Sequence, residues 1–286
     1  MTRIVQDTSP TDFLSRAGTL LYQDEPTNSL MLGLCGNILR AKEPPKQAPL
    51  FLRMEIDGRT VTAAIQTPPM NLVIAYADRE QLNLLAKHLS DMKVEFPGVV
   101  GPANASETFA AIWSELTGKT VTLGMGQKIY KIESVCLPPT FGNLRLAEPQ
   151  ETDIIAHWLV DFGDESLPPP ERKSFEERKP HAVRAIENKL AYVWTVDGKP
   201  VSTAHVGRPT ENGISVSAVY TPKHLRKKGY ASATVAHLSQ KMLDSGKKFC
   251  VLYTDLSNPT SNKIYQNVGY QEVSDSKHFL FGGKCV

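Results

Sequence analysis

The spacing of apolar residues predicts alternating strands and helices over the second half of the chain. Apolar positions three and four residues apart, typical of one face of a helix, occur over residues 150–162 and 229–245. Short alternating or continuous apolar segments predict strands at residues 143–148, 190–196, 201–207, 213–220, 249–254 and 279–281. Asp197-Gly198 is a two-residue turn signal, so the strands on either side of it are expected to form a hairpin.

Proline, glycine and asparagine mark the ends of two further helices in this half. Asn258-Pro259 is expected to open a helix that Gly269 ends. Residues 163–180 are rich in proline and charge, and they are expected to form a loop that enters a helix near residues 182–189.

The first half of the chain repeats this order of elements. Asp57-Gly58 is again a hairpin signal between two predicted strands. The predicted elements are, in order, helices at 12–23 and 26–39, strands at 50–56, 60–66 and 71–76, a helix at 78–91, a strand near Val99, a helix at 106–116 and a strand at 121–132.

The repeated order predicts an internal duplication with a boundary near Pro138-Pro139, which gives domains at residues 1–138 and 139–286. Two unrelated α+β domains are the alternative. Each half places an antiparallel hairpin before β-α-β crossovers. The expected fold class is therefore α+β, with a mixed, mostly antiparallel sheet flanked by helices.

Composition excludes several classes of protein. The net charge is only +2, and neither half carries the basic excess of a nucleic-acid binder. No apolar run approaches the ~20 residues that span a bilayer, and the N-terminus has no apolar signal segment. The four cysteines are scattered without a C-x-x-C pair, so we expect no metal site and no disulfide framework, only buried cysteines in a reduced, cytosolic protein.

The segment that carries chemistry is ISVSAVYTPKHLRKKGYA, residues 214–231. A predicted strand ends near Tyr220, and the cations Arg226, Lys227 and Lys228 precede Gly229 at the start of a predicted helix. The backbone N–H groups at a helix N-terminus are unpaired, and the helix dipole adds positive charge there. This arrangement suits a pyrophosphate, although a solvated basic turn is the alternative.

A second pattern follows this loop: Asn258, Ser261, Tyr265, Gly269 and Tyr270 have the spacing N-x-x-S-x-x-x-Y-x-x-x-G-Y. With the preceding R-x-x-G-x-A loop, it resembles the GNAT N-acetyltransferase superfamily over residues 144–281. The two halves together resemble tandem members of that superfamily, with a degenerate first half.

The resemblance implies acetyl-CoA as the donor and no metal. It implies that the loop before and at the start of the helix holds the pyrophosphate, chiefly through backbone N–H groups. The residues of this loop are Arg226, Lys227, Lys228, Gly229, Tyr230 and Ala231. The strand end Val219-Tyr220-Thr221 is then expected to pair its backbone with the pantetheine arm. Asn258 is expected to contact the pantetheine, or to act as a helix N-cap, or both. Ser261 and Asn262, one turn further on, are candidates to face the CoA.

Tyr265 is the candidate general acid, because a phenol with a pKa of about 10 is protonated at neutral pH and can protonate a leaving thiolate. Packing of its ring is the alternative role. The general base is open: His205 and Asp255 are weak candidates, and direct attack by a neutral amine is a further possibility.

The first half lacks the glycine loop, since its strand at 71–76 passes directly into Asp78-Arg79-Glu80. We therefore expect one donor site, in the second half; a second CoA site in the first half is the alternative. The expected function is transfer of an acetyl group from acetyl-CoA to a primary amine in a ternary complex. A non-catalytic acyl-CoA-binding regulatory module is the rival. The residues define neither the acceptor nor an oligomeric state.

Overall fold

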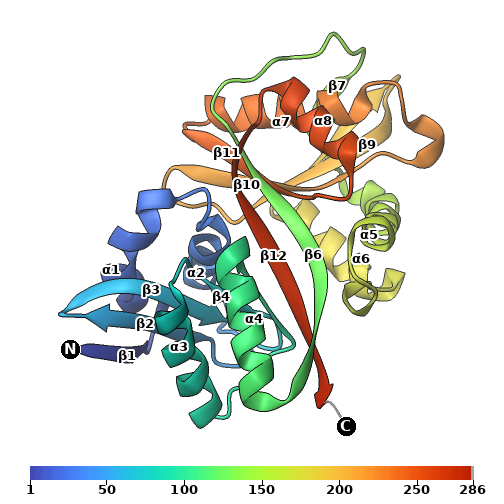
Figure 1. The fold of residues 1–286 in the computed structure, drawn as a ribbon. Coiled ribbons are helices and arrows are strands. Elements are labelled where there is room, and N and C mark those ends of the chain that lie inside the picture. Colours follow the sequence, from blue (N-terminus) through green and yellow to red (C-terminus); the bar gives the residue numbers. More distant parts are fainter. Residues whose placement is uncertain (285–286) are drawn as a thin grey trace. The chain divides into compact units, whose positions relative to one another are not determined.

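A computed structural model describes residues 1–284, and the side chains of these except those of Pro170 and Lys284. The helices are α1 (Pro10–Leu21), α2 (Ser29–Arg40), α3 (Arg79–Asp91), α4 (Ala103–Thr117), α5 (Thr152–Ser166), α6 (Phe175–Glu187), α7 (Tyr230–Asp244) and α8 (Pro259–Val268), with short 3-10 turns η1 (Tyr22–Asp24), η2 (Pro149–Glu151), η3 (Pro169–Glu171) and η4 (Lys223–Leu225). The strands are β1 (Thr2–Asp7), β2 (Leu50–Ile56), β3 (Arg59–Gln66), β4 (Leu72–Ile74), β5 (Gly98–Pro102), β6 (Lys119–Ile132), β7 (Asn143–Leu146), β8 (Ala191–Val196), β9 (Lys199–Gly207), β10 (Gly213–Tyr220), β11 (Phe249–Asp255) and β12 (Gln271–Lys284) (Figure 1).

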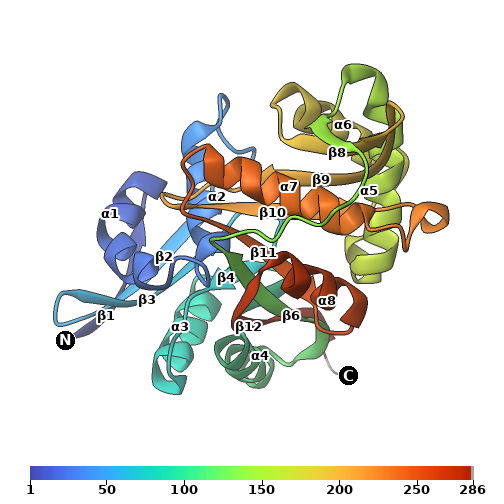
Figure 2. The same cartoon turned by 90° about the horizontal axis from the view of Figure 1, so that it is seen from above.

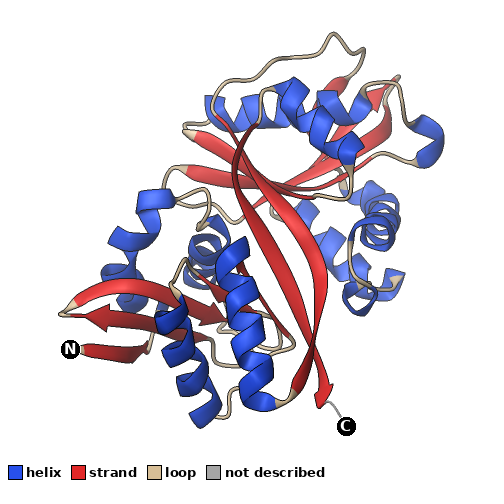
Figure 3. Ribbon diagram, in the orientation of Figure 1, coloured by secondary structure: helices blue, strands red, loops and turns tan. Residues whose placement is uncertain are grey.

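The chain forms two compact units that do not follow a single cut along the sequence. Among the described residues, the first unit contains 1–129, 208–210 and 273–284, and the second contains 130–207 and 211–272. Two long strands, β6 and β12, therefore contribute residues to both units. Helices and strands mix throughout, and most strand pairs are antiparallel, so the α+β class with a mostly antiparallel open sheet is confirmed (Figure 3).

In the first unit, the strand order is β1-β2-β3-β4-β5-β12-β6. Alternate residues of β2 serve the two faces of the sheet: Leu52 packs with α3 and α4, whereas Phe51 packs with α1 and α2. Each face therefore has its own apolar core under a pair of helices.

In the second unit, the order is β6-β11-β10-β9-β8-β7. Helices α7 and α8 cover one face, with Val235 and Leu238 in the core, and α5 and α6 cover the other, where Trp158 and Leu159 are buried. Figure 2 shows α7 lying across the strands of this unit. The sheet thus separates an α5–α6 side from an α7–α8 side.

Both predicted hairpin turns are present. Asp57 and Gly58 have φ values of 49° and 80°, and Asp197 and Gly198 have φ values of 48° and 75°. Positive φ at both central residues is what a two-residue type I′ turn needs. The local turn chemistry was therefore sufficient to locate these hairpins.

The stretch at 163–180, predicted as a loop, is partly helical. Helix α5 continues to Ser166, and α6 begins at Phe175, well before the predicted start. A capping box fixes that start, because the Ser174 hydroxyl accepts from the Glu177 N–H while the Glu177 carboxylate accepts from the Ser174 N–H. The helix continues through Pro180, which lies in its interior.

Two strands differ from the apolar pattern. β1 was not predicted, and β12 is longer than the predicted 279–281. β12 includes polar residues whose charges are paired, such as Lys277 with Glu107. The cysteine prediction holds for the buried Cys35 and Cys250 but is wrong for Cys136, which is exposed; Cys285 lies outside the described residues.

Candidate functional site

The strands β10 and β11 separate part of the way along their length. They pair in parallel from Gly213 to Ser215, and no later pair between them occurs within residues 1–284. The register of β10 against β9 then shifts between Ser217 and Tyr220, with Ala218 at a φ of 50°. This β-bulge lies in the part of β10 that no longer pairs with β11.

The loop that follows β10 leads to an uncapped helix start. Lys227 and Gly229 both have positive φ, and Gly229 is the N-cap residue of α7. No side chain caps the first turn, and this turn contains no acidic residue. Lys227 and Lys228 are exposed. The backbone N–H groups from Tyr230 and Ala231 onward are thus free of a capping carboxylate, as an anion site at a helix N-terminus requires.

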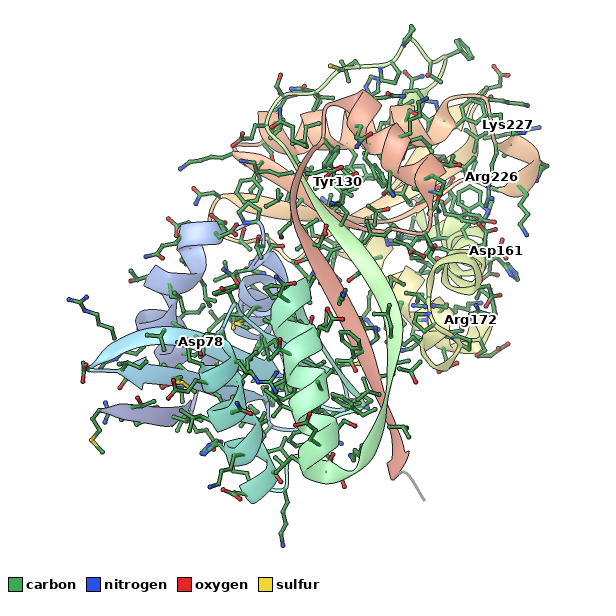
Figure 4. All side chains as sticks on the ribbon, in the orientation of Figure 1. Asp78, Tyr130, Asp161, Arg172, Arg226 and Lys227 are labelled. Carbon is green, nitrogen blue, oxygen red and sulfur yellow. The ribbon has the colours of Figure 1, made fainter. Side chains whose placement is uncertain are left out.

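Arg226 does not offer its side chain to this helix start. Its Nε donates to the Thr221 carbonyl oxygen at 2.9 Å, and its Nη2 donates to the two carboxylate oxygens of Glu165 at 3.0 and 2.7 Å. In Figure 4, Arg226 lies between Lys227 and Asp161. Of the three cations that precede Gly229, Arg226 is therefore paired with a carboxylate. The two lysines have no carboxylate partner in the described part of the chain.

The side chains at the end of β10 are held by the fold. The Tyr220 hydroxyl donates to Asp161 at 3.0 Å, and burial, together with that carboxylate, raises the pKa of Tyr220 to about 12. The Thr221 hydroxyl donates to Ser202 at 2.8 Å, and Ser202 in turn donates to the Tyr220 carbonyl oxygen at 3.0 Å. Val219 and Tyr230 are both partly buried against apolar clusters.

The polar residues predicted to contact CoA at the start of α8 form local hydrogen bonds in the structure. The Asn258 side chain accepts from the Ser261 N–H at 3.1 Å, so Asn258 is a helix N-cap. The Asn262 side chain accepts from the Thr254 hydroxyl at 3.0 Å and reaches the Asp255 carbonyl oxygen at 3.4 Å. These contacts tie the end of β11 to α8.

Tyr265, on α8, lies in the core beside Tyr130 of β6. Its ring is 6.4 Å from that of Tyr130 and 6.0 Å from that of Tyr270, and only 9% of the residue is exposed. Burial raises the pKa of Tyr265 to about 12, so the hydroxyl stays protonated across the neutral range. No described residue hydrogen-bonds to it.

The two base candidates lie in different surroundings. His205 is buried on β9 opposite Ser217 of β10, its Nε2 has no partner in the described structure, and burial lowers its pKa to about 4. Asp255 accepts from the Ser257 N–H at 2.8 Å in the turn before α8. The structure therefore makes His205 a neutral imidazole and Asp255 a turn residue.

The residues that sequence reasoning missed are Asp161 and Glu165 on α5. They are acidic residues in a charge-mixed stretch, and their partners lie 59 and 61 positions further along the chain. They line a cavity of about 630 Å³ together with Trp158, Tyr220 and Lys223. Only their spacing of one helical turn could have indicated a shared role.

Neither a membrane span nor a metal cluster is found in the described part of the chain. None of its helices is both long enough and apolar enough to cross a bilayer. No group of three His, Cys, Asp or Glu side chains comes together there in a way that could hold an ion.

Comparison with known proteins gives a family match over the region that contains these elements. The sequence model of the acetyltransferase (GNAT) family matches residues 153–270, which include the bulged strand, the loop, α7 and α8. No curated protein sequence matches the chain significantly.

Solved structures match the chain over its full length. A GNAT acetyltransferase from Sphaerobacter thermophilus has a TM-score of 0.61 at 14% identity and covers 99% of this chain and 98% of its own. An acetyltransferase from Colwellia psychrerythraea has a TM-score of 0.57 at 13% identity, covering 98% of both chains. A tandem GNAT protein from the clavulanic acid biosynthesis pathway has a TM-score of 0.56 at 10% identity, covering 100% of both.

At these identities the solved structures show the fold alone, and the family assignment comes from the sequence match. Residues 153–270 therefore form a domain that matches the acetyltransferase (GNAT) family, and the chain over its whole length has a tandem GNAT-like fold.

Proposed function

We propose that the protein is an N-acetyltransferase that moves an acetyl group from acetyl-CoA to a primary amine, by direct attack in a ternary complex. The observation that carries this proposal is the separation of β10 from β11 beside the uncapped start of α7. One feature suits the pantetheine arm and the other suits the pyrophosphate, and they adjoin along the chain.

The donor site consists mainly of backbone groups. The free edge of Val219, Tyr220 and Thr221 hydrogen-bonds to the pantetheine amides as an added strand would. The N–H groups of the loop and the first turn of α7, from Lys227 to Ala231, bind the pyrophosphate. Lys227 and Lys228 add charge, whereas the Arg226 side chain does not, because Glu165 already neutralises it.

The start of α8 completes the donor site in this proposal. Asn258 keeps its role as N-cap and contacts the pantetheine with the atoms that the cap leaves free. The half-buried Ser261 hydroxyl faces the cofactor, and Asn262 positions the start of α8 through Thr254.

Bound acetyl-CoA supplies a thioester, whose carbonyl carbon the amine attacks and whose thiolate must leave. Tyr265 provides the proton for that thiolate. Its raised pKa keeps the hydroxyl protonated, and the hydroxyl is available to donate because no described residue forms a hydrogen bond with it.

The amine reacts in its neutral form. A His205 imidazole with a pKa of about 4 is too weak a base to hold a proton taken from an ammonium group. A lysine-like amine is only ~0.1% neutral at pH 7.4. Turnover at subsaturating amine should therefore rise about tenfold per pH unit below the pKa of the amine.

The decisive experiment measures release of free CoA thiol from acetyl-CoA on a panel of amines, amino acids and peptides, with the acetylated product identified by mass spectrometry. Thiol release that depends on one class of amine supports the proposal. Tight binding of acetyl-CoA with no acetylated product from any class would contradict it and favour an acyl-CoA-binding regulatory module.

A further inference from the structure

Both ends of the loop at residues 221–229 are tied to the same helix. Tyr220, which precedes the loop, donates from its hydroxyl to Asp161 at 3.0 Å. Arg226, near the far end of the loop, donates to both carboxylate oxygens of Glu165. Asp161 and Glu165 are four residues apart on α5, so they project from the same face of that helix.

The two ends of the loop also contact each other directly. The Arg226 guanidinium lies 5.5 Å from the centroid of the Tyr220 ring, and Arg226 Nε donates to the Thr221 carbonyl oxygen at 2.9 Å. Lys223 adds a longer ion pair to Glu165, at 3.7 Å. We call the four side chains Asp161, Glu165, Tyr220 and Arg226 the α5 clamp.

The clamp contributes more to the position of the loop than to the stability of the fold. The side chains of Arg226 and Glu165 are 39% and 33% exposed, and ion pairs at such exposure contribute little to folding. However, the residues that follow Arg226 directly are Lys227, Lys228 and Gly229, whose positive-φ turn sets the direction of the N–H groups at the start of α7.

We propose that Asp161 and Glu165 are positioning residues for the donor loop, and that Arg226 acts through Glu165 and not as a phosphate ligand. This inference rests on the proposed function. It has an unusual consequence. The negatively charged Glu165 increases the affinity for the CoA pyrophosphate, although it repels that anion, because it holds the loop in place.

The direction in which Glu165→Gln changes CoA affinity distinguishes a positioning role from a purely electrostatic one. If charge alone mattered, Glu165→Gln would strengthen CoA binding, since it removes a negative charge and frees Arg226. If the clamp positions the loop, the same change weakens CoA binding by about 3- to 10-fold, the effect of losing a modest ion-pair network. Asp164→Asn is the matched control, because Asp164 lies on the same helix and has no hydrogen bond to the loop among the described residues.

The measurement is calorimetric titration of the full-length protein with CoA. Weaker binding by Glu165→Gln, with Asp164→Asn equal to or slightly tighter than the wild type, supports the clamp. Equal or tighter binding by Glu165→Gln overturns it. In a double-mutant cycle, the effects of Glu165→Gln and Arg226→Gln on CoA affinity should be strongly non-additive, because both variants break the contact between Arg226 and Glu165. Fully additive effects would mean that Arg226 acts on CoA independently of Glu165, which would overturn the assignment of Arg226.

Hydrogen exchange in the free protein tests the clamp without any ligand. The amides of Leu225 and Arg226 donate to the carbonyl oxygens of Pro222 and Lys223 at 2.8 and 3.4 Å. They should exchange faster in Glu165→Gln than in the wild type or Asp164→Asn, while the amides of α7 beyond the first turn stay protected. Identical exchange in all three proteins overturns the inference. If the wild type did not bind CoA, the proposed function would fail, but the exchange result would still decide whether the clamp holds the loop.

Discussion

Helices α3 and α7 occupy the same place in the order of elements of the two units, yet they start differently. Four residues join β4 to α3, whereas nine join β10 to α7. Asp78 caps α3 in a capping box with Gln81, so its carboxylate accepts from a first-turn N–H group. Gly229 starts α7 with no side-chain cap. One helix start satisfies its own donors, and the other leaves them for a ligand.

The strands beside these helices differ in the same sense. β4 and β5 pair in parallel at Leu72 and Val73. They stay close to the end of β4, where a Cβ on Gly101 would lie only 2.5 Å from the Ile74 carbonyl oxygen. β10 and β11 pair only as far as Ser215. A strand pair that stays closed has no free backbone edge for a pantetheine arm.

Helices α4 and α8, which follow β5 and β11, also differ in the role of one residue near the helix end. Tyr265 lies four residues before Gly269, which ends α8, and Ser114 lies four residues before Gly118, which ends α4. The Ser114 hydroxyl donates to the Lys119 carbonyl oxygen at 2.7 Å, so it serves the helix end. The same architecture therefore supports a catalytic proposal in one unit and a purely structural account in the other.

The largest expected effect is on Tyr265. In Tyr265→Phe, turnover should fall by up to ~10²–10⁴, the range for loss of a general acid, while acetyl-CoA affinity stays nearly unchanged. Since the pKa of Tyr265 is about 12, the wild type should show no alkaline loss of turnover from this group between pH 6 and 10. Steady-state kinetics with a titration of acetyl-CoA measures both quantities.

Tyr270→Phe is the matched control, because Tyr270 is also buried but its hydroxyl shares a 2.8 Å hydrogen bond with Ser239. This control should lose stability and keep turnover per folded molecule. Near-normal turnover by a stable Tyr265→Phe protein would remove the acid role and leave the two units alike in this respect.

The next effect concerns Gly229. Gly229→Glu should weaken CoA binding by at least ~100-fold, because a side chain blocks the close backbone approach and its charge opposes the pyrophosphate. Gly246→Glu is the control at the other end of α7: it also has positive φ, and nothing lies within 4 Å of its Cβ position. Calorimetry should give normal affinity for this control. Equal affinity in both variants would mean that the start of α7 does not hold the donor.

Stoichiometry tests the comparison more directly. The full-length protein should bind one CoA per chain, because the capped start of α3 and the closed strands of the first unit leave no second site. Removing the acidic cap with Asp78→Ser should leave the value at one. A value near two for the wild type would show that the first unit binds CoA in another way.

Local signals in the sequence were enough for much of this comparison. The Asp-Gly pairs located both hairpins, the glycines and Asn258-Pro259 located helix ends, and the loop before Gly229 was distinguished from the acidic start of α3. Each of these depends on residues within a few positions of one another, so the amino-acid types alone set the backbone conformation.

The features that escaped prediction depend on distant partners. Arg226 has the appearance of a phosphate ligand until Glu165, 61 positions earlier, is placed beside it. β12 is a strand despite its polar residues, because β5 pairs with it from Ser276 to Leu280. Such pairings follow from the tertiary fold, and no local pattern encodes them.

The smallest expected effect compares the caps of the two units. Asn258→Ala and Asp78→Ala should each lower the free energy of unfolding by about 1 kcal/mol, since each removes a side-chain cap. Only Asn258→Ala should also weaken CoA binding, by a few fold, because α8 borders the proposed donor site and α3 does not. Asn258→Ser keeps a hydroxyl that can cap but is too short to repeat the amide contact, so it should restore stability and leave CoA binding weakened. If Asn258→Ser restored both, the effect on CoA would come from the cap alone, and Asn258 would serve α8 in the way that Asp78 serves α3.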